Sequence, residues 1–340
     1  MVLRPCYHPF MHFRRTLCCF LVSLIAACGK GADSETADSG SGDKAPLCST
    51  VVTSTDPGNG SMDHYYRDPI RFYLSEPDPT AQVITDMVGE TRREDGGSTI
   101  VFEPRGNLSP STEYSAGLDY CYGEPEITFT TSHYGVPLEA SADLSGRAYS
   151  IAFNSGEYTV GENAGELLNA VFTRPVLVQF EEVNGGFVDI TAAIGMPGVQ
   201  PPQQDMCART ITLRQVSINE LPFLSGGVAD FEFGAQGGIL RFASLTFEGT
   251  VSSDASTLGG IAYDAVMGAE EIVSLLPEFG NLDSVCDLAE NLGIPCSPCP
   301  NDSARQCIPM AAKGIYASQI DETLVSIAEA GTHEECGAAE

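Results

Sequence analysis

The chain has 340 residues, of which 46 are Asp or Glu and 17 are Lys or Arg, so its formal net charge is −29 at pH 7. So acidic a chain lacks the basic surface that releases counterions from phosphates, which excludes nucleic acid and anionic head groups as expected partners. We expect the acidity to serve solubility, because the sequence contains no loop of EF-hand type for cation binding.

The N-terminal segment has the features of a bacterial lipoprotein signal peptide. Three arginines within the first 15 residues precede the uncharged apolar run 17–27. A spanning helix needs about 20 apolar residues, whereas a signal-peptide core needs roughly 7 to 15, so this run predicts secretion rather than a membrane-spanning anchor. The run leads into IAAC at residues 25–28, which resembles the lipobox recognised by lipoprotein signal peptidase.

We therefore expect cleavage after residue 27 and a covalent lipid on Cys28; the alternative is an ordinary signal cut beside a bystander cysteine. Loss of residues 1–27 removes three Arg and no acid, which leaves 14 basic against 46 acidic residues and a formal charge of −32. No later segment has 18 uncharged apolar residues in a row, so the lipid is the expected membrane contact. The expected location is the cell envelope, on the outer membrane, and no other cofactor is expected.

A flexible tether is predicted for residues 28–47. The stretch 29–46 is rich in Gly, Ser and Asp and has no large apolar residue, so it cannot bury enough surface to offset its ordering entropy. The folded part is then expected to begin at Cys48.

Residues 48–132 have the spacing of a small β-sandwich. Short β-branched or aromatic runs alternate with Pro, Gly, Asn and Asp clusters, which predicts strands at 49–54, 69–75, 82–88, 99–103, 113–121 and 126–131. The strings STDPGNG, DPIRFYLSEP, TIVFEP, LSPSTEY and ITFTT resemble the SbsA-type bacterial Ig-like domain. In that family the pattern marks strand edges and corners, so the resemblance implies a sandwich and no active site.

The pattern of individual residues in this segment also supports a sandwich, independently of the family resemblance. Ile70, Phe72 and Leu74 alternate with more polar neighbours, which predicts one buried strand face. In LSPSTEY, Leu108 and Tyr114 are expected to be buried, with the tyrosine hydroxyl bonded back to the backbone as in a tyrosine corner.

Residues 133–340 are predicted to form a larger, mainly antiparallel β domain. Expected strands are 148–153, 176–182, 187–194, 209–215, 228–233, 240–251, 260–266 and 308–320. Apolar residues recur at period two with polar neighbours, which predicts strands with one wet face. Helices are expected at 163–172 and, on a helical period with Gly293 as its stop, at 281–292. The fold class is therefore all-β with minor helix.

The cysteines indicate an exported protein with disulfides. Eight remain after processing and lipidation: Cys48, Cys121, Cys207, Cys286, Cys296, Cys299, Cys307 and Cys336. An even set in an oxidising compartment implies disulfide bonds. Cys48 and Cys121 are expected to pair because they share the first domain.

The segment 286–307 leaves three alternatives. Its four cysteines, with one C-x-x-C core among prolines, could be structural disulfides, a zinc site or a redox pair. Zinc sites of this kind usually have two such knuckles, and a redox pair usually starts a helix, so we favour a stiff loop with disulfides Cys286–Cys296 and Cys299–Cys307. Cys207 then pairs with Cys336. No metal ligands are assigned.

Histidines offer no catalytic pattern. Three histidines remain after processing, and all three are expected at the surface. His64 is expected in a turn, His133 in the interdomain hinge and His333 near the terminus. No nucleophile elbow, H-E-x-x-H motif or P-loop accompanies them, so no catalytic residue is assigned.

These observations predict a non-catalytic, lipid-anchored envelope protein in which the Ig-like domain is a spacer and residues 133–340 bind an envelope partner. One alternative is a carrier of a lipid or other apolar ligand, because the amphipathic strands 240–251 and 308–320 could curl into a half-barrel with an apolar pocket. The other is a hydrolase with an unrecognised site.

Overall fold

The computed structural model describes residues 48–160, 174–235, 238–275, 280–333 and 336. The signal peptide, Cys28, the tether and the helix expected at 163–172 lie outside these residues. Within them the chain is mostly β, with few short helices, which confirms the predicted fold class. No helix in this part of the chain is long and apolar enough to cross a membrane.

The first strands form two four-stranded sheets around a shared core. The sheet orders are β1-β3-β6-β5 and β2-β8-β7-β4. The strands are β1 Val52–Asp56, β2 Ser61–His64, β3 Ile70–Leu74, β4 Gln82–Ile84, β5 Gly89–Glu94, β6 Thr99–Pro104, β7 Glu113–Asp119 and β8 Glu126–Thr131, with the 3-10 turn η1 at Asp95–Gly97. Ile70, Phe72 and Leu74 are buried in this core, as predicted.

The hydrogen bond predicted between the Tyr114 hydroxyl and the backbone is confirmed. The backbone N–H of Ser109 donates to the Tyr114 hydroxyl at 2.9 Å, and Leu108 is buried. Tyr114 itself is only half-buried. The resemblance to the SbsA-type family, and the domain boundary at residue 133, stay predictions.

Two strands of this region were missed because their side chains are polar. β2 is SMDH and β5 is GETRRE, and neither has an apolar alternation. β5 lies at the edge of its sheet, where charged side chains are tolerated because one flank faces solvent. The strand expected at 82–88 ends at Ile84.

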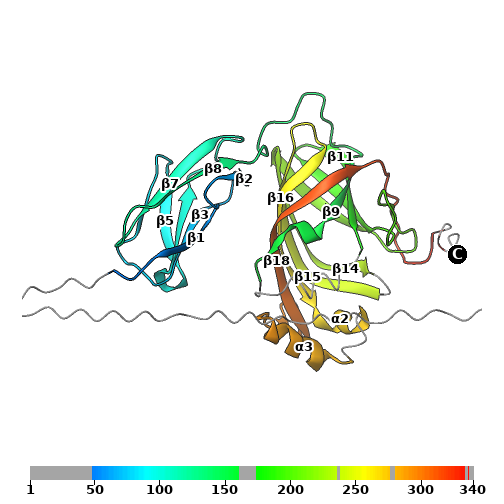
Figure 1. The fold of residues 1–340 in the computed structure, drawn as a ribbon. Coiled ribbons are helices and arrows are strands. Elements are labelled where there is room, and N and C mark those ends of the chain that lie inside the picture. Colours follow the sequence, from blue (N-terminus) through cyan, green and yellow to red (C-terminus); the bar gives the residue numbers. More distant parts are fainter. Residues whose placement is uncertain (1–47, 161–173, 236–237, 276–279, 334–335, 337–340) are drawn as a thin grey trace, which may run out of the picture. The chain divides into compact units, whose positions relative to one another are not determined.

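Eight strands of the described C-terminal residues close into an antiparallel barrel (Figure 1). They follow the order β9-β11-β12-β13-β14-β15-β16-β18, and β18 pairs back onto β9 through Ala148↔Ile320 and Ile151↔Ala317. The bounds are β9 Ala148–Ala152, β11 Val176–Asn184, β12 Phe187–Ile194, β13 Ile211–Glu220, β14 Phe223–Ala235, β15 Gly238–Val251, β16 Thr257–Gly268 and β18 Asp302–Ile320. Closure removes both sheet edges, whereas the sequence suggested at most a half-barrel.

Two short strands pair with the long β18 beside the barrel. The 3-10 turn η2, Phe153–Ser155, separates β9 from β10, Glu157–Tyr158, which continues the pairing with β18. β17, Ser297–Cys299, forms a hairpin with the start of β18. The C-x-x-C segment therefore forms one strand of a hairpin, which corrects the stiff loop predicted there. β18 also begins at Asp302, before the predicted residue 308.

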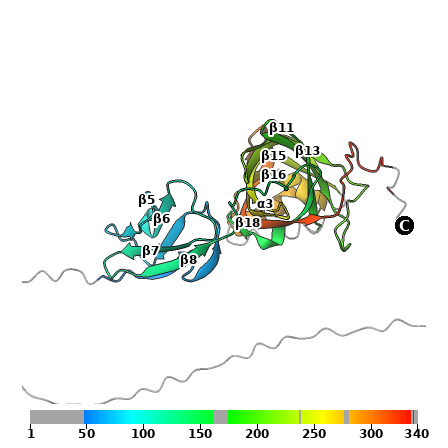
Figure 2. The same ribbon diagram turned by 90° about the horizontal axis from the view of Figure 1, so that it is seen from above.

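Two helices lie between β16 and β18. α3, Leu282–Asn291, matches the predicted helix, and the Asn281 side chain caps it by accepting from Ser284 N–H at 3.0 Å. Val285 and Ala289 of α3 belong to the hydrophobic core of the barrel. Viewed along the barrel, α3 lies across one end of the bore (Figure 2). α2, Ala269–Leu275, was not predicted, because seven residues are too few to establish a helical period.

Candidate ligand-binding cavity

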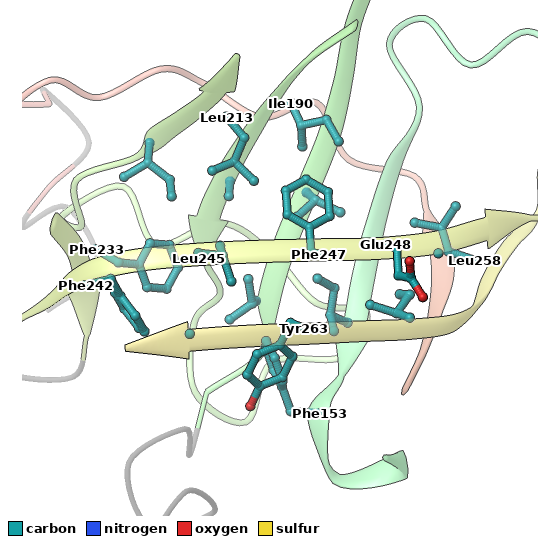
Figure 3. Close-up of a pocket in the computed structure, with 18 of the residues that line it drawn as sticks. Phe153, Ile190, Leu213, Phe233, Phe242, Leu245, Phe247, Glu248, Leu258 and Tyr263 are labelled. Carbon is teal, nitrogen blue, oxygen red and sulfur yellow. The ribbon is translucent and has the colours of Figure 1, made fainter. Parts of the chain in front are cut away.

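The interior of the barrel contains an apolar cavity of about 150 Å³. The surface exposed to it is contributed by apolar atoms. Aliphatic side chains make up most of the wall, and aromatic rings contribute to it as well: Phe153, Phe180, Phe231, Phe233, Phe242, Phe247 and Tyr263. Figure 3 shows several of these side chains between the strands, together with Leu213, Leu245 and Ile190.

Strand alternation places these side chains inside. On β15, Leu245 and Phe247 line the cavity, while Thr246 between them is exposed. β14 contributes Phe231 and Phe233, of which Phe231 lies directly opposite Phe242 of β15. The wall thus follows from a period of two on strands that the sequence already predicted.

Small residues in the wall leave the cavity open. Ala192 and Ala265 line it at positions where larger apolar residues would occupy the space. Gly226 has a related effect, because a Cβ there would lie 2.8 Å from the Cζ atom of Phe247. The absence of a side chain at 226 therefore lets the Phe247 ring pack against β14.

Two tyrosine hydroxyls are buried in the barrel region without a hydrogen-bond partner among the described residues. They belong to Tyr158 of β10 and Tyr263 of β16. Both residues pair with Ala312 of β18, one from each side, so their side chains emerge on the same face of the sheet. Burial raises the pKa of both hydroxyls, and the nearby Tyr158 raises that of Tyr263 further. Both groups are therefore neutral at physiological pH.

The hydroxyl of another barrel tyrosine, in contrast, has a hydrogen-bond partner. Tyr149 is completely buried, and its hydroxyl donates to the Ala255 carbonyl at 2.7 Å. Burial raises the pKa of Tyr149 to about 12.

The predicted cysteine pairs all appear as disulfides. They are Cys48–Cys121, Cys207–Cys336, Cys286–Cys296 and Cys299–Cys307. Zinc needs free thiolates, and a C-x-x-C redox pair would join Cys296 to Cys299, so this connectivity favours structural disulfides over both. Among the described residues no group of three or more His, Cys, Asp and Glu side chains is placed to hold a metal ion.

The three histidines differ in their surroundings. His64 is buried at the end of β2, which corrects the expected surface turn; its Nε2 lies 3.2 Å from the Asp68 carbonyl oxygen. Burial lowers the pKa of His64. His133 is exposed, and His333 is half-buried near the disulfide of Cys336.

Part of this site can be predicted from the sequence. The amphipathic strands predicted at 240–251 and 308–320 supply Leu245, Phe247 and Met310 to the wall. Tyr158 and Tyr263 were not recognised, because a lone tyrosine in an apolar strand carries no sequence signal that distinguishes a satisfied hydroxyl from an unpaired one.

Comparison with known proteins leaves the family open. No protein-family model and no curated protein matches the chain. Among solved structures, an L,D-transpeptidase from Mycobacterium smegmatis shares 13% identity over 49% of this chain and 75% of its own. The TM-score is 0.21, so this similarity supports no conclusion about fold or function.

Proposed function

We propose that the C-terminal barrel binds a small apolar ligand and that a lipid on Cys28 holds it at the cell envelope. The observation that carries the proposal is the apolar cavity of about 150 Å³ inside the barrel. Eight-stranded barrels have an interior that side chains can fill or that can hold one small ligand, and here the side chains leave space.

The size of the cavity limits the ligand. Drug-sized molecules occupy pockets of roughly 300–1,000 Å³, whereas a dry apolar cavity of about 150 Å³ in another protein accepts benzene or xenon. A single aromatic ring or a short hydrocarbon chain therefore fits the cavity as it stands. The aromatic wall favours a ring, because paired rings attract beyond their area of contact.

This proposal favours a carrier of an apolar ligand over a protein whose first domain is a spacer and whose second domain binds an envelope partner. Binding a protein partner through a surface requires no internal cavity, and an unfilled apolar space lowers stability through lost packing contacts. Because the empty space lowers the stability of the barrel, its presence favours a role in ligand binding.

Benzene binding to the full chain with Cys28→Ser, which avoids detergent, tests the proposal by calorimetry or ligand-observed NMR. Ala265→Leu should weaken binding at least roughly tenfold, because three added carbons enter the cavity. Ala262→Leu is the matched control: it makes the same change on the same strand, between the lining residues Ile261 and Tyr263 but not itself lining the cavity. Equal affinity of all three proteins, or no binding at all, would contradict the proposal.

A further inference from the structure

Residues 321–331, here called the C-terminal strap, follow β18 and lie against the outside of the barrel wall (Figure 1). Strand alternation turns Leu177 of β11 and Ala193 of β12 away from the cavity, because their neighbours along each strand line it. Both side chains are nevertheless buried. Leu324 of the strap packs against them in a hydrophobic cluster separate from the barrel core. The strap therefore covers apolar side chains that the two strands present to the outside.

Three buried polar side chains of the barrel region hold the backbone of the strap. Gln179, Gln204 and Thr210 are 6%, 3% and 8% exposed. Their side-chain oxygens accept from the backbone N–H groups of Leu324, Val325 and Ile327, at 2.7, 2.7 and 2.9 Å respectively. Release of the strap would break these bonds, so the covered arrangement is the stable one.

The strap crosses β9, the shortest strand of the closed barrel. Ile320 at the end of β18 pairs with Ala148 of β9, and Ala148 pairs in turn with Gln179 of β11. Because the Leu324 N–H binds the Gln179 side chain, the chain passes from β18 to β11 between residues 320 and 324, over the strand between them. The strap thus clasps the seam at which the barrel closes.

Opening of this seam would expose the cavity. β9 pairs with β11 at four positions and with β18 at five, so few backbone pairs have to separate. Ile151 of β9 lines the cavity, and so do Val176 and Val178 of β11. A ligand that enters between these strands reaches the cavity directly.

Both ends of the barrel are covered by other segments. α3 lies across one end, with Val285 and Ala289 buried in the barrel core (Figure 2). At the other end the segment before β9 lies against the β15–β16 turn, where the Glu139 N–H donates to the Ser253 carbonyl at 2.8 Å. Leu144 of that segment is buried in the same core. Ligand exchange therefore requires a local opening of the barrel.

We propose that the C-terminal strap is a latch that controls ligand exchange at the β9 seam, and that the disulfide Cys207–Cys336 locks it. This inference rests on the proposed function of the cavity. The Gly331 N–H donates to the Cys207 carbonyl at 2.9 Å, and the disulfide ties the chain beyond it to the same residue. Cys207 is exposed, so a dithiol reductant can reach this bond. The dithiol becomes a disulfide, and Cys207 and Cys336 each gain one hydrogen as free thiols.

The rates of benzene binding and release on the full Cys28→Ser chain, from NMR line shapes, test the latch. Adding Cys207→Ser and Cys336→Ser should raise both rates at least roughly tenfold, because the strap is no longer tied down. The affinity should change less than about twofold, because the strap does not line the cavity. The matched control, Cys48→Ser with Cys121→Ser, removes a disulfide outside the barrel and should change neither rate.

A second pair of variants tests the strap with every disulfide intact. Leu324→Ala removes the apolar side chain that covers Leu177 and Ala193, so it should raise both rates as well. Val325→Ala is the matched control, because this neighbouring side chain is 40% exposed and its backbone bonds to Gln204 remain. Equal rates in Leu324→Ala and Val325→Ala would contradict the latch, even if the double serine variant does not fold.

Amide hydrogen exchange separates this inference from the proposed function, because it needs no ligand. The amides of β9 should exchange at least about tenfold faster in the Cys207→Ser, Cys336→Ser protein, whereas those of β15 should change little. Unchanged exchange at β9, or benzene binding with unchanged rates, overturns the latch alone. Absence of benzene binding in every protein overturns the proposed function.

Discussion

The rings of Phe231 and Phe242 stack across β14 and β15 with 4.8 Å between centroids and an interplanar angle of 5°. The two residues are direct cross-strand partners, and Phe242 also pairs with Met267, two residues before α2. This stacked pair forms the cavity wall next to the helices, so it contributes both to the stability of the barrel and to the shape of the site.

Truncation of this pair should destabilise the barrel and enlarge the cavity. We expect Phe242→Ala to lower the free energy of unfolding by about 3–5 kcal/mol, because a large buried side chain leaves a space that the barrel fills only partly. Urea unfolding measures the change. Phe187→Ala, at a side chain 44% exposed on β12, is the control and should cost much less. A loss below about 1 kcal/mol for Phe242→Ala would show that the ring is not packed as described.

The buried tyrosines predict a loss of stability in alkali. The unfolded chain ionises its tyrosines near pH 10, whereas burial raises the pKa of Tyr149 to about 12 and that of Tyr263 upward as well. Above pH 10 the unfolded state therefore binds fewer protons than the native state, and the free energy of unfolding falls as the pH rises towards 12. Below pH 10 both states keep these protons, so the same groups cause no change there.

Unfolding by urea at pH 8 and pH 11 measures this effect. Tyr149→Phe should be less stable than the starting protein at pH 8 by about 1–3 kcal/mol, because the Ala255 carbonyl loses its buried donor. Its further loss between pH 8 and pH 11 should be smaller, because one ionising group is gone. An identical fall in both proteins would contradict the role of Tyr149.

The disulfides predict a definite mass and a dependence on oxidation. Four bonds remove eight hydrogens from the all-thiol chain, two for each pair. Intact-mass measurement on protein from an oxidising compartment should show that difference. Reduction should lower stability most through Cys207–Cys336 and Cys48–Cys121, whose partners are 129 and 73 residues apart, because longer closed loops restrict the unfolded chain more. Chelation should have no effect. Stoichiometric zinc with free thiols would reverse the assignment.

The lipoprotein signal predicts the location of the protein. Cys28→Ser should move the protein from the membrane fraction to the supernatant while its circular dichroism spectrum stays the same, because the lipid is the expected membrane contact. Fractionation with an antibody to the chain checks this. A cleaved Cys28→Ser protein that still sediments with membranes would refute the lipid anchor.

Much of the secondary structure could be predicted from the sequence because it depends on neighbours along the chain. Period-two runs indicated most of the barrel strands, and Asn281 with a helical period indicated α3. Cysteine counting and position led to the four pairs found in the structure. The edge strand β5 was not predicted, because its sequence is mostly charged and has no alternation of apolar and polar residues.

The barrel and its cavity were decided only by tertiary structure. Closure depends on the pairing of β9 with β18, which are about 170 residues apart in the chain, and no local pattern encodes such a partner choice. The cavity depends on small residues of separate strands, Ala192 of β12 and Ala265 of β16, lining the same interior. The volume left between side chains that are distant in sequence cannot be derived from a linear pattern. The unpaired hydroxyls of Tyr158 and Tyr263 likewise emerge only when three strands align at Ala312, because hydrogen-bond satisfaction is a property of the folded neighbourhood.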